Sequence, residues 1–369
     1  MNYKERIKNL RNRIKALNLD GFIVSNEFNR RYMSGFTGST GVLFIDSKDA
    51  FMITDSRYYI QVKQQCPDFK LIPQGTLTAF EALIAKKDLQ GKSIGFEADT
   101  VTAATLKRMK KTLKGIKLVP TEQILIRIRA IKSAEEVQKI RQAQAITDKC
   151  FKMILDTLKP GMTEKQVAWT MEKFHREHGA SGDSFKAIVA SGPNSAMPHA
   201  VTSDRKLKKN EPVLFDFGCL YDGYCSDMTR VVFLGKPTKK FEMIYNRVLE
   251  THLMVFELSK PGASVAEIDR ITRDYIYKTT FEGKPLMGEK KGQGRYEHGL
   301  GHGVGLEVHE LPVLSYKVKK DVLQPGNIVT DEPGIYIEGE GGVRIEDIMH
   351  ITSDGVESLT GSPKELIVL

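Results

Sequence analysis

The sequence predicts an α+β protein of two domains, in which a smaller α/β domain precedes a larger one built from two related halves. At 369 residues the chain is longer than a usual single domain. Helical and strand-like patterns alternate in its first third. Beyond that, the tripeptide Lys-Pro-Gly occurs at 159–161 and again at 260–262, each time before a helical pattern. We therefore expect domains at residues 1–130 and 131–369.

The first domain is expected to contain an amphipathic helix followed by short strands. Ile7, Leu10, Ile14 and Leu17 recur at steps of three and four residues, which is typical of a helix over residues 4–19. Strand-like runs follow at 21–25, 41–46 and 50–55, and a further helix is expected at 100–114. This mixture predicts a small α/β domain.

The second domain contains good helix starts and an internal repeat. Ser133 precedes two glutamates, which favour the first turn of a helix. Thr163 with Gln166, and Ser264 with Glu267, have the three-residue spacing of a capping box. Each of these last two helices is followed by a histidine-bearing loop, and then by a strand with a carboxylate two residues before a glycine. The repeat predicts two pseudo-symmetric halves with a site at their interface.

Composition and charge limit the class of protein. The net charge is +9, but acidic residues are interspersed with the lysines and no stacking-aromatic motif accompanies them, so we expect no nucleic-acid partner. No apolar run approaches the roughly 20 residues that span a bilayer, and the N-terminus lacks the apolar core of a signal peptide. The four cysteines are scattered without a CxxC pair. We expect a cytoplasmic protein with reduced thiols and no membrane partner.

Two aspartates lie in or beside an apolar hairpin. Asp216 interrupts the apolar run 213–217, and burial of a lone carboxylate costs several kcal/mol unless a cation, a proton or hydrogen bonds compensate. The Asp-Gly pair at 222–223 predicts a two-residue turn. In that register position 216 faces position 229, and Asp227 becomes a diagonal neighbour of Asp216 on the same face. Two carboxylates this close repel each other unless positive charge lies between them, so a metal pair is expected.

The second half contains a similar set of residues. Glu332 follows a strand, and Glu346 lies in the apolar segment 343–348, which is expected to be one strand with Arg344 on the same face. The glycine-rich loop at 338–342 would return the chain so that the two glutamates approach each other, in a register that the sequence does not specify. His302 lies among glycines, which allow close backbone approach to a site. One imidazole with four carboxylates suits Mn²⁺, Co²⁺ or Fe²⁺ better than a structural zinc cage.

These residues lie in segments that resemble the creatinase/aminopeptidase family with the pita-bread fold, and most closely its Xaa-Pro peptidase branch of aminopeptidase P and prolidase. The segments of the second domain are SGPNSAMPHA (191–200), DFGCLYDGYCSDMTR (216–230), HGLGHGVGLEVHE (298–310), TDEPGIYI (330–337) and GGVRIED (341–347). The first domain resembles the family more loosely, through GFTGSTG (35–41) and TDSRYYIQ (54–61). Relatives often carry Gly where this chain has Ser56, a departure that puts little in doubt.

The resemblance implies a pita-bread catalytic domain, with pseudo-twofold symmetry, after a creatinase-like N-terminal domain. It implies a dinuclear centre with five metal ligands, Asp216, Asp227, His302, Glu332 and Glu346. The expected metal is Mn²⁺, with Co²⁺, Fe²⁺ or Zn²⁺ as alternatives. Two such ions lower the pKa of a bridging water towards about 7, so that the resulting hydroxide attacks the carbonyl before proline.

The resemblance also assigns supporting roles. Glu332 is expected to act as general base as well as ligand, the alternative being a ligand alone. His199 would donate to the substrate carbonyl or oxyanion, and His309 would contact the substrate or shuttle the leaving-group proton. His298 and Arg344 are expected to bind substrate, although Arg344 could instead pair with a carboxylate of the site or lie on the surface. The residues expected to be structural are His175, His178, His252 and His350, with Trp169 in the core.

The function expected from this resemblance is an Xaa-Pro aminopeptidase that acts on proline-containing peptides, as a homodimer. An Xaa-Pro dipeptidase, or prolidase, is the alternative within the same branch. A pita-bread protein that binds without catalysis belongs to a different class, and the intact ligand set speaks against it. Amidinohydrolase chemistry on creatine-like substrates is a third possibility.

Overall fold

A computed structural model describes residues 2–369. The chain divides into two compact units, residues 1–129 and 130–369. Among the described residues no helix is both long enough and apolar enough to cross a membrane.

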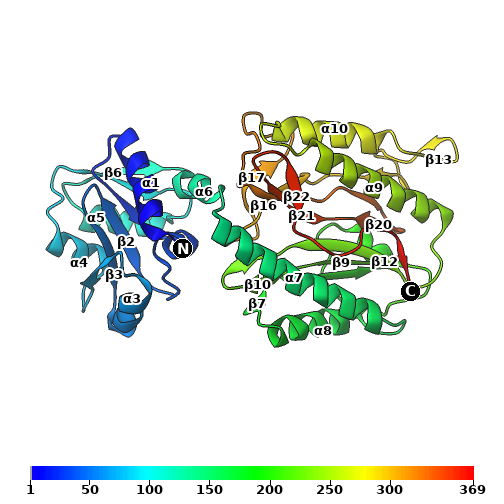
Figure 1. The fold of residues 1–369 in the computed structure, drawn as a ribbon, viewed down its shortest axis with the longest axis horizontal. Helices are drawn as coiled ribbons and strands as arrows, with labels where there is room; N and C mark the ends of the chain where they lie inside the picture. The colour runs from blue at the N-terminus through cyan, green and yellow to red at the C-terminus, as the bar shows by residue number, and fades with distance from the viewer. Residues whose placement is uncertain (1) are drawn as a thin grey trace. The chain divides into compact units, whose positions relative to one another are not determined.

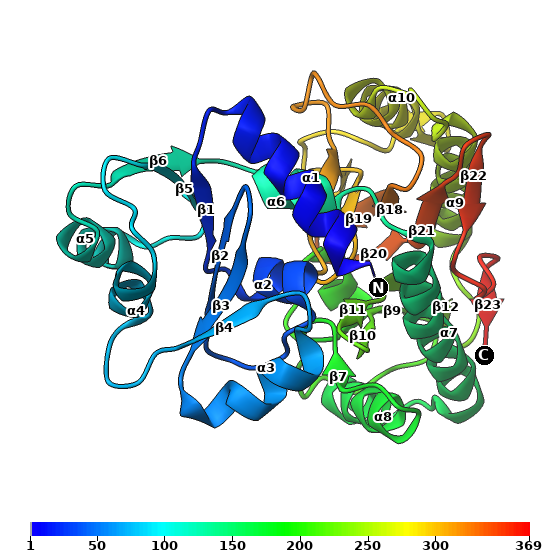
Figure 2. The same cartoon turned by 60° about the vertical axis from the view of Figure 1, so that its left-hand side comes forward.

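The first unit is a six-stranded mixed sheet covered by helices. Its strands are ordered β4-β3-β2-β1-β5-β6. They are β1 Gly21–Val24, β2 Val42–Asp46, β3 Ala50–Thr54, β4 Lys70–Pro73, β5 Ser93–Glu97 and β6 Lys117–Thr121. The helices are α1 Tyr3–Ala16, α2 Glu27–Ser34, α3 Tyr59–Gln65, α4 Ala79–Lys86, α5 Ala103–Thr112 and α6 Ile124–Arg129, with a 3₁₀ turn at Ser56–Tyr58. In Figure 2, α4 and α5 lie on one side of the sheet and α1 lies on the other. The expected helix at 4–19 and the expected strands at 21–25, 41–46 and 50–55 are confirmed within a few residues.

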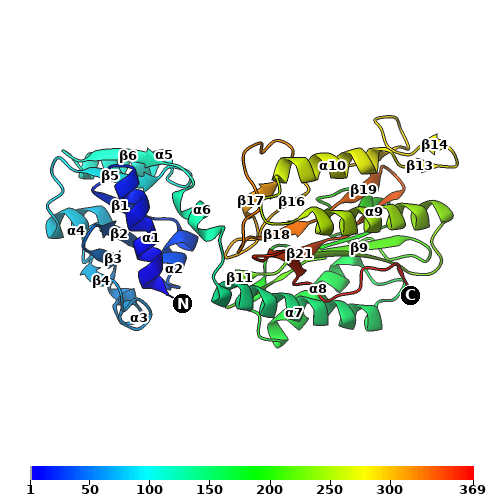
Figure 3. The same cartoon turned by 45° about the horizontal axis from the view of Figure 1, so that its top comes forward.

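The second unit places sheets between two pairs of helices. The helices are α7 Ala134–Thr157, α8 Glu164–Glu177, α9 Lys239–Leu258 and α10 Val265–Tyr277. Figures 1 and 3 show α7 and α8 on one side of the strands and α9 and α10 on the other. The expected helix starts are confirmed, because Ser133 and Thr163 each form a capping box and Ser264 accepts from the backbone of Glu267. The architecture is the α+β pita-bread arrangement expected from the sequence.

The strands of this unit form several sheets. A four-stranded sheet has the order β23-β12-β9-β8, and a five-stranded sheet has the order β17-β16-β18-β21-β22. Their strands are β8 Ile188–Ser191, β9 Pro212–Phe217, β12 Met228–Phe233, β16 Gly301–Gly303, β17 Glu310–Leu314, β18 Ile328–Asp331, β21 Asp347–Ile351, β22 Val356–Ser358 and β23 Ile367–Val368. Smaller sheets contain β7 Gly182–Asp183, β10 Cys219–Tyr221, β11 Tyr224–Cys225, β13 Thr280–Phe281, β14 Lys284–Pro285, β15 Gly294–Arg295, β19 Gly334–Ile337 and β20 Gly341–Arg344. A 3₁₀ turn spans Gly192–Ala196.

Each half of the second unit contributes one hairpin that positions candidate ligands. In the first half, β10 pairs with β11 around the turn at 222–223, and the same register continues into β9 and β12, where Asp216 faces Thr229. This confirms the expected pairing. In the second half, Gly334 faces Arg344 and Asp331 faces Asp347. These two ladders share one register, so that Glu332 and Glu346 are opposite each other between them.

Two local expectations are wrong. The segment 343–348 is not one strand, because β20 ends at Arg344 and β21 begins at Asp347 in another sheet. The chain crosses between sheets at Glu346, whose backbone N–H donates to the carbonyl of Thr229 on β12. Trp169 is not in the core, since 65% of it is exposed on α8.

Candidate metal centre

The first hairpin brings two aspartates to one face. Asp216 lies near the end of β9 and Asp227 immediately precedes β12. Asp227 is buried, and its Oδ1 has no hydrogen-bond partner among residues 2–369. Oδ2 of Asp216 accepts from Nη2 of Arg344 at 2.5 Å. One aspartate is therefore balanced by a guanidinium, while the other is buried with an unsatisfied oxygen, which is costly unless a cation is present.

The second hairpin presents two glutamates. Glu332 follows β18, and Glu346 lies between β20 and β21. Oε2 of Glu346 accepts from Oγ1 of Thr229 at 2.6 Å, which anchors it to the first half. Nε of Arg344 donates to the same hydroxyl at 3.0 Å. Thr229 and Arg344 together therefore connect Glu346 to Asp216 of the first half.

His302, on β16, completes the group. Its Nε2 lies 3.6 Å from Oδ2 of Asp227 and 3.5 Å from Oε1 of Glu332. One ligand atom each from Asp227, His302 and Glu346 lies within 4.8 Å of the others. Asp216 is outside this group of three. The structure thus brings carboxylates from both halves around a single imidazole.

Burial changes the acidity of these groups. Burial, and then the charges of neighbouring carboxylates, raises the pKa of Asp227 and Glu346 well above the usual range. Burial raises the pKa of Glu332 to about 8, although the charge of Arg344 opposes the shift. Burial also lowers the pKa of His302 to about 4, so its ring is neutral and able to bind a metal at neutral pH. The cluster therefore favours bound protons or bound cations over four bare charges.

The residues fit divalent metal ions. An unsatisfied carboxylate oxygen on Asp227, a neutral imidazole on His302 and an oxygen-rich surrounding are what Mn²⁺, Fe²⁺ or Co²⁺ prefer. Among the lysines and arginines of residues 2–369, Arg344 is the one that lies within 4 Å of a carboxylate of this centre. Its single charge cannot balance four carboxylates.

The remaining histidines of the expected site lie near this centre. His309 packs against His302, with ring centroids 4.3 Å apart. Burial raises the pKa of Asp216, and the positive charges of Arg344, His199 and His309 oppose that shift. The side chains of His199 and His309 are exposed. His298 is more enclosed, with Nδ1 3.8 Å from Oε2 of Glu332.

Comparisons with known proteins identify the family. Residues 138–353 match Metallopeptidase family M24, and residues 6–131 match the Creatinase/Prolidase N-terminal domain. The chain belongs to metallopeptidase family M24. It is therefore a peptidase that uses divalent metal ions. A peptidase of Bacillus subtilis described as uncharacterized is 40% identical to it over 99% of this chain and 100% of that protein.

Solved structures of similar proteins carry related names. An Xaa-Pro dipeptidase from Bacillus anthracis has a TM-score of 0.92 at 39% identity and covers 100% of both chains. An X-Pro aminopeptidase from Thermotoga maritima has a TM-score of 0.86 at 33% identity, covering 97% of this chain and 100% of that one. A prolidase from Pyrococcus horikoshii has a TM-score of 0.88 at 32% identity, covering 98% and 100%.

Several supporting residues of this M24 site were not expected from the sequence. Thr229 joins Glu346 to Arg344, and the hydroxyl of Tyr336 accepts from Nη1 of Arg344 at 2.8 Å and lies 2.9 Å from Nε2 of His298. The strand alternation around 229 was a signal for the threonine, because it shares a face with Asp227. No local signal marked the tyrosine.

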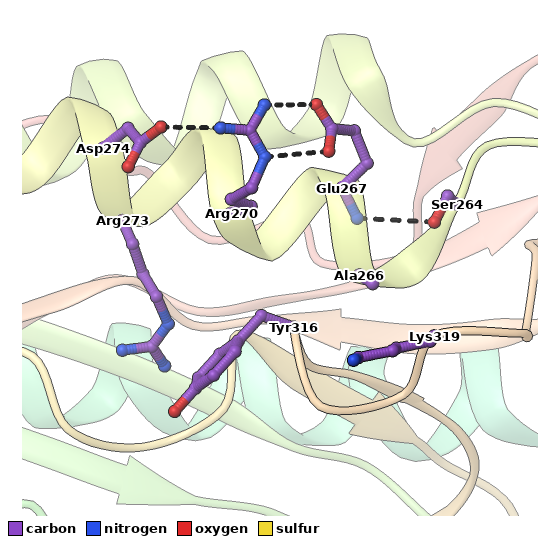
Figure 4. A pocket seen from close by; sticks show the side chains of 8 residues that line it. All are labelled: Ser264, Ala266, Glu267, Arg270, Arg273, Asp274, Tyr316 and Lys319. Carbon is purple, nitrogen blue, oxygen red and sulfur yellow. Dashed lines mark hydrogen bonds and ion pairs between the residues drawn. The ribbon is translucent and has the colours of Figure 1, made fainter.

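A pocket of about 390 Å³ lies at the start of α10, outside the metal centre of the M24 unit (Figure 4). Arg270 lies between Glu267 and Asp274 and forms ion pairs with both. Arg273 donates through Nη2 to the backbone carbonyl of His298. The pocket's charges are thus largely paired with one another, and Arg273 links its wall to the segment that carries His298.

Proposed function

We propose that this chain is a dinuclear-metal exopeptidase that removes the residue preceding proline at a peptide N-terminus. The observation that carries the proposal is the approach of Asp227, His302 and Glu346, whose ligand atoms lie within 4.8 Å of one another. Such a group, buried between two hairpins, is suited to a metal-dependent hydrolase. Membership of family M24 supports the same chemistry.

The proposed ligands of two ions are Asp216, Asp227, His302, Glu332 and Glu346. Mn²⁺ is the proposed metal, with Co²⁺, Fe²⁺ or Zn²⁺ as alternatives, because the donor set is rich in oxygen. When bound, the ions activate a water for attack at neutral pH and polarise the scissile carbonyl.

The chain's own side chains handle protons and substrate. We propose that Glu332 accepts the proton released by the attacking water, since it lies 3.5 Å from His302 within the centre. His199 would donate to the oxyanion and His309 to the leaving amine. The exposure of both histidines supports these roles, because a substrate must reach them from solvent.

His298 and Arg344 are proposed to bind substrate from the more enclosed side. Burial, and then the charge of Arg344, lowers the pKa of His298 to about 3, so its ring is neutral. A neutral imidazole beside Tyr336 offers hydrogen bonds without adding charge. Arg344 already pairs with Asp216, which supports a role in holding that carboxylate as well.

A second candidate is an Xaa-Pro dipeptidase. It is favoured by the similarity to the Xaa-Pro dipeptidase from Bacillus anthracis, at 39% identity over the whole chain. The aminopeptidase is favoured by the segments at 35–41 and 54–61 and by the similarity to the Thermotoga maritima enzyme. The two candidates share one centre and differ only in the length of peptide accepted.

The test compares a dipeptide, a longer peptide and a control without proline. Enzyme stripped with EDTA is supplied with Mn²⁺ and offered Ala-Pro, Ala-Pro-Ala-Ala and Ala-Ala-Ala-Ala. The aminopeptidase releases alanine from the tetrapeptide that contains proline, and EDTA abolishes the release. Cleavage confined to Ala-Pro would assign the dipeptidase. No cleavage of either proline peptide by metal-loaded enzyme would overturn the proposal.

We also propose a cytoplasmic location and a homodimer. The four cysteines are buried and unpaired, which suits a reducing compartment. Sedimentation of the purified chain measures its oligomeric state directly, and a monomer at micromolar concentration would contradict the proposal.

A further inference from the structure

A buried histidine lies behind the strands that lead to the two glutamates. His252 on α9, Asp331 at the end of β18 and Asp347 at the start of β21 are all fully buried. Nδ1 of His252 lies 2.9 Å from Oδ2 of Asp331, and its Nε2 lies 3.4 Å from Oδ2 of Asp347. Burial disfavours a charged ring, but the two carboxylates outweigh it and raise the pKa of His252 to about 9. A charged imidazole thus bridges two strands.

The bridged aspartates are chain neighbours of the proposed ligands. Asp331 directly precedes Glu332, Asp347 directly follows Glu346, and the two aspartates face each other across the β18–β21 ladder. Side chains of successive residues in extended chain point to opposite sides. Asp331 and Asp347 therefore point to the side of the two strands that faces away from the glutamates, and His252 bridges them on that side.

The two aspartates depend on His252 to different degrees. Asp347 also pairs with Nη2 of Arg230 at 2.7 Å and with Nζ of Lys364 at 2.7 Å. For Asp331, His252 is the only ionic partner within 4 Å in the described part of the chain. Removal of the imidazole would leave Asp331 buried without a counter-charge.

The first half of the domain shows what the same place holds without charge. The Lys-Pro-Gly tripeptides at 159–161 and 260–262 align the two halves. Counted back from each tripeptide by the same number of residues, Phe151 on α7 corresponds to His252 on α9. The equivalent helices thus carry an apolar ring in one half and an imidazole in the other.

The strands show the same exchange. Phe215 precedes Asp216 as Asp331 precedes Glu332, and the residue after Asp227, Met228, corresponds to Asp347. The rings of Phe151 and Phe215 are 6.4 Å apart, and both belong to one hydrophobic cluster with Met228. The first half therefore packs three apolar side chains at the places that His252, Asp331 and Asp347 occupy in the second half. Packing alone does not require charged residues at these places.

We propose that His252 is a positioning residue that bridges Asp331 and Asp347. The bridge fixes the spacing of Glu332 and Glu346, and through them the affinity for metal. Buried ion pairs add little stability compared with apolar residues of similar size, and in some proteins they instead specify one geometry. The inference rests on the proposed metal-binding role of the two glutamates, and it adds a residue that touches neither metal nor substrate.

The experiment separates positioning from packing. His252→Phe combined with Asp331→Leu replaces the charged pair by apolar side chains of the kind found in the first half. Thermal unfolding in EDTA measures the stability of the metal-free chain, and calorimetric titration with Mn²⁺ measures affinity. We expect unfolding within a few degrees of the wild type, but Mn²⁺ affinity lower by roughly 10–100-fold, as for other groups that orient metal ligands.

The matched control is Phe151→Leu, which loosens the equivalent place in the first half. Its Mn²⁺ affinity should remain within about threefold of the wild type. Wild-type affinity in the double variant, or an equal loss in Phe151→Leu, would overturn the inference. If the double variant does not fold, His252→Gln combined with Asp331→Asn keeps the approximate shapes, removes both charges and carries the same expectation.

A parallel titration of Glu346→Gln with Mn²⁺ separates the ligand role of Glu346 from the positioning role of His252. If this variant binds Mn²⁺ like the wild type, the ligand assignment itself is wrong. If it loses the metal while the His252 variants retain wild-type affinity, only the positioning role fails.

Discussion

Lys132 and Glu310 form a buried ion pair beside the candidate centre, and its removal should destabilise the second unit strongly. Nζ of Lys132 lies 3.0 Å from Oε2 of Glu310, and the side chains are 1% and 2% exposed. Glu310 directly follows His309 and begins β17. A buried pair that loses one partner costs about 3–5 kcal/mol, whereas an exposed pair is worth about 0–1 kcal/mol. The low exposure of both side chains makes this a buried pair, to which the larger figure applies.

The structure narrows the loss in the free energy of unfolding that is expected for Lys132→Met. Oε1 of Glu310 still accepts from the backbone of Glu307 at 3.1 Å after the lysine is removed. That retained bond favours the lower end of the range, about 3 kcal/mol. Combining Lys132→Met with Glu310→Gln removes both charges and keeps an acceptor for the same N–H. The double variant should therefore recover about 2 kcal/mol relative to the sum of the single variants.

Urea unfolding in EDTA, followed by tryptophan fluorescence, measures these free energies. Trp169 is the only tryptophan in the sequence and lies in the second unit, so its signal reports on that unit. Lys165→Met is the control, because Lys165 pairs with Asp204 at 2.7 Å with both side chains more than half exposed. It should cost less than about 1 kcal/mol. If Lys132→Met lowers the free energy of unfolding no more than Lys165→Met does, the reasoning is refuted. The same holds if the double variant loses the full sum of the two single losses.

Four further outcomes are expected. Glu346→Gln should weaken Mn²⁺ binding by roughly 100-fold or more in calorimetric titration, since it neutralises a proposed ligand. His199→Ala should lower kcat by roughly 10²–10³-fold with unchanged metal content by mass spectrometry, and loss of metal would instead make it a ligand. Arg273→Ala should lower kcat/KM about tenfold without metal loss, because the backbone carbonyl of His298 loses a charged donor. Hydrogen bonding to Lys70 and to a second lysine lowers the pKa of Asp49 to about 2. The stability that ionised Asp49 contributes is therefore present above about pH 4 and is lost as the pH falls towards 2. Asp49→Asn should flatten the acid-unfolding curve in that window.

The first hairpin could be predicted because its turn is encoded locally. Asp222 and Gly223 both have positive φ, at 47° and 81°, as a two-residue hairpin turn requires. Once the turn is fixed, strand alternation determines that Asp216 faces Thr229. The second hairpin lacks such a signal, since its turn is longer and the chain changes sheets at Glu346. Its register could therefore come only from the structure.

Trp169 shows the limit of apolar periodicity. Val167 and Met171 are fully buried and define the inner face of α8. Trp169 is two residues from each, which places it about 200° around the helix, on the outer face. An apolar residue within a helical pattern is thus buried only if it shares the angle of the core positions.

His252 could not be recognised from the sequence for a different reason. Its partners, Asp331 and Asp347, lie far along the chain, and no residue beside it on α9 suggests an ion pair. Only the repeat offered a hint, because the equivalent position holds Phe151. A comparison of the two halves position by position would have shown an apolar residue exchanged for a histidine, but not the charge that it meets.

The buried charge of the centre also bears on how many ions it holds. Four carboxylates face the single guanidinium of Arg344, which leaves three negative charges uncompensated if all are ionised. One divalent ion would leave one negative charge in a buried site, which is unfavourable. Two divalent ions reverse the sign and leave one positive charge, which suits a site that must accept an anionic or polarised group of a peptide. Titration should therefore give two Mn²⁺ per chain, and saturation at one ion would mean that part of the cluster keeps its protons.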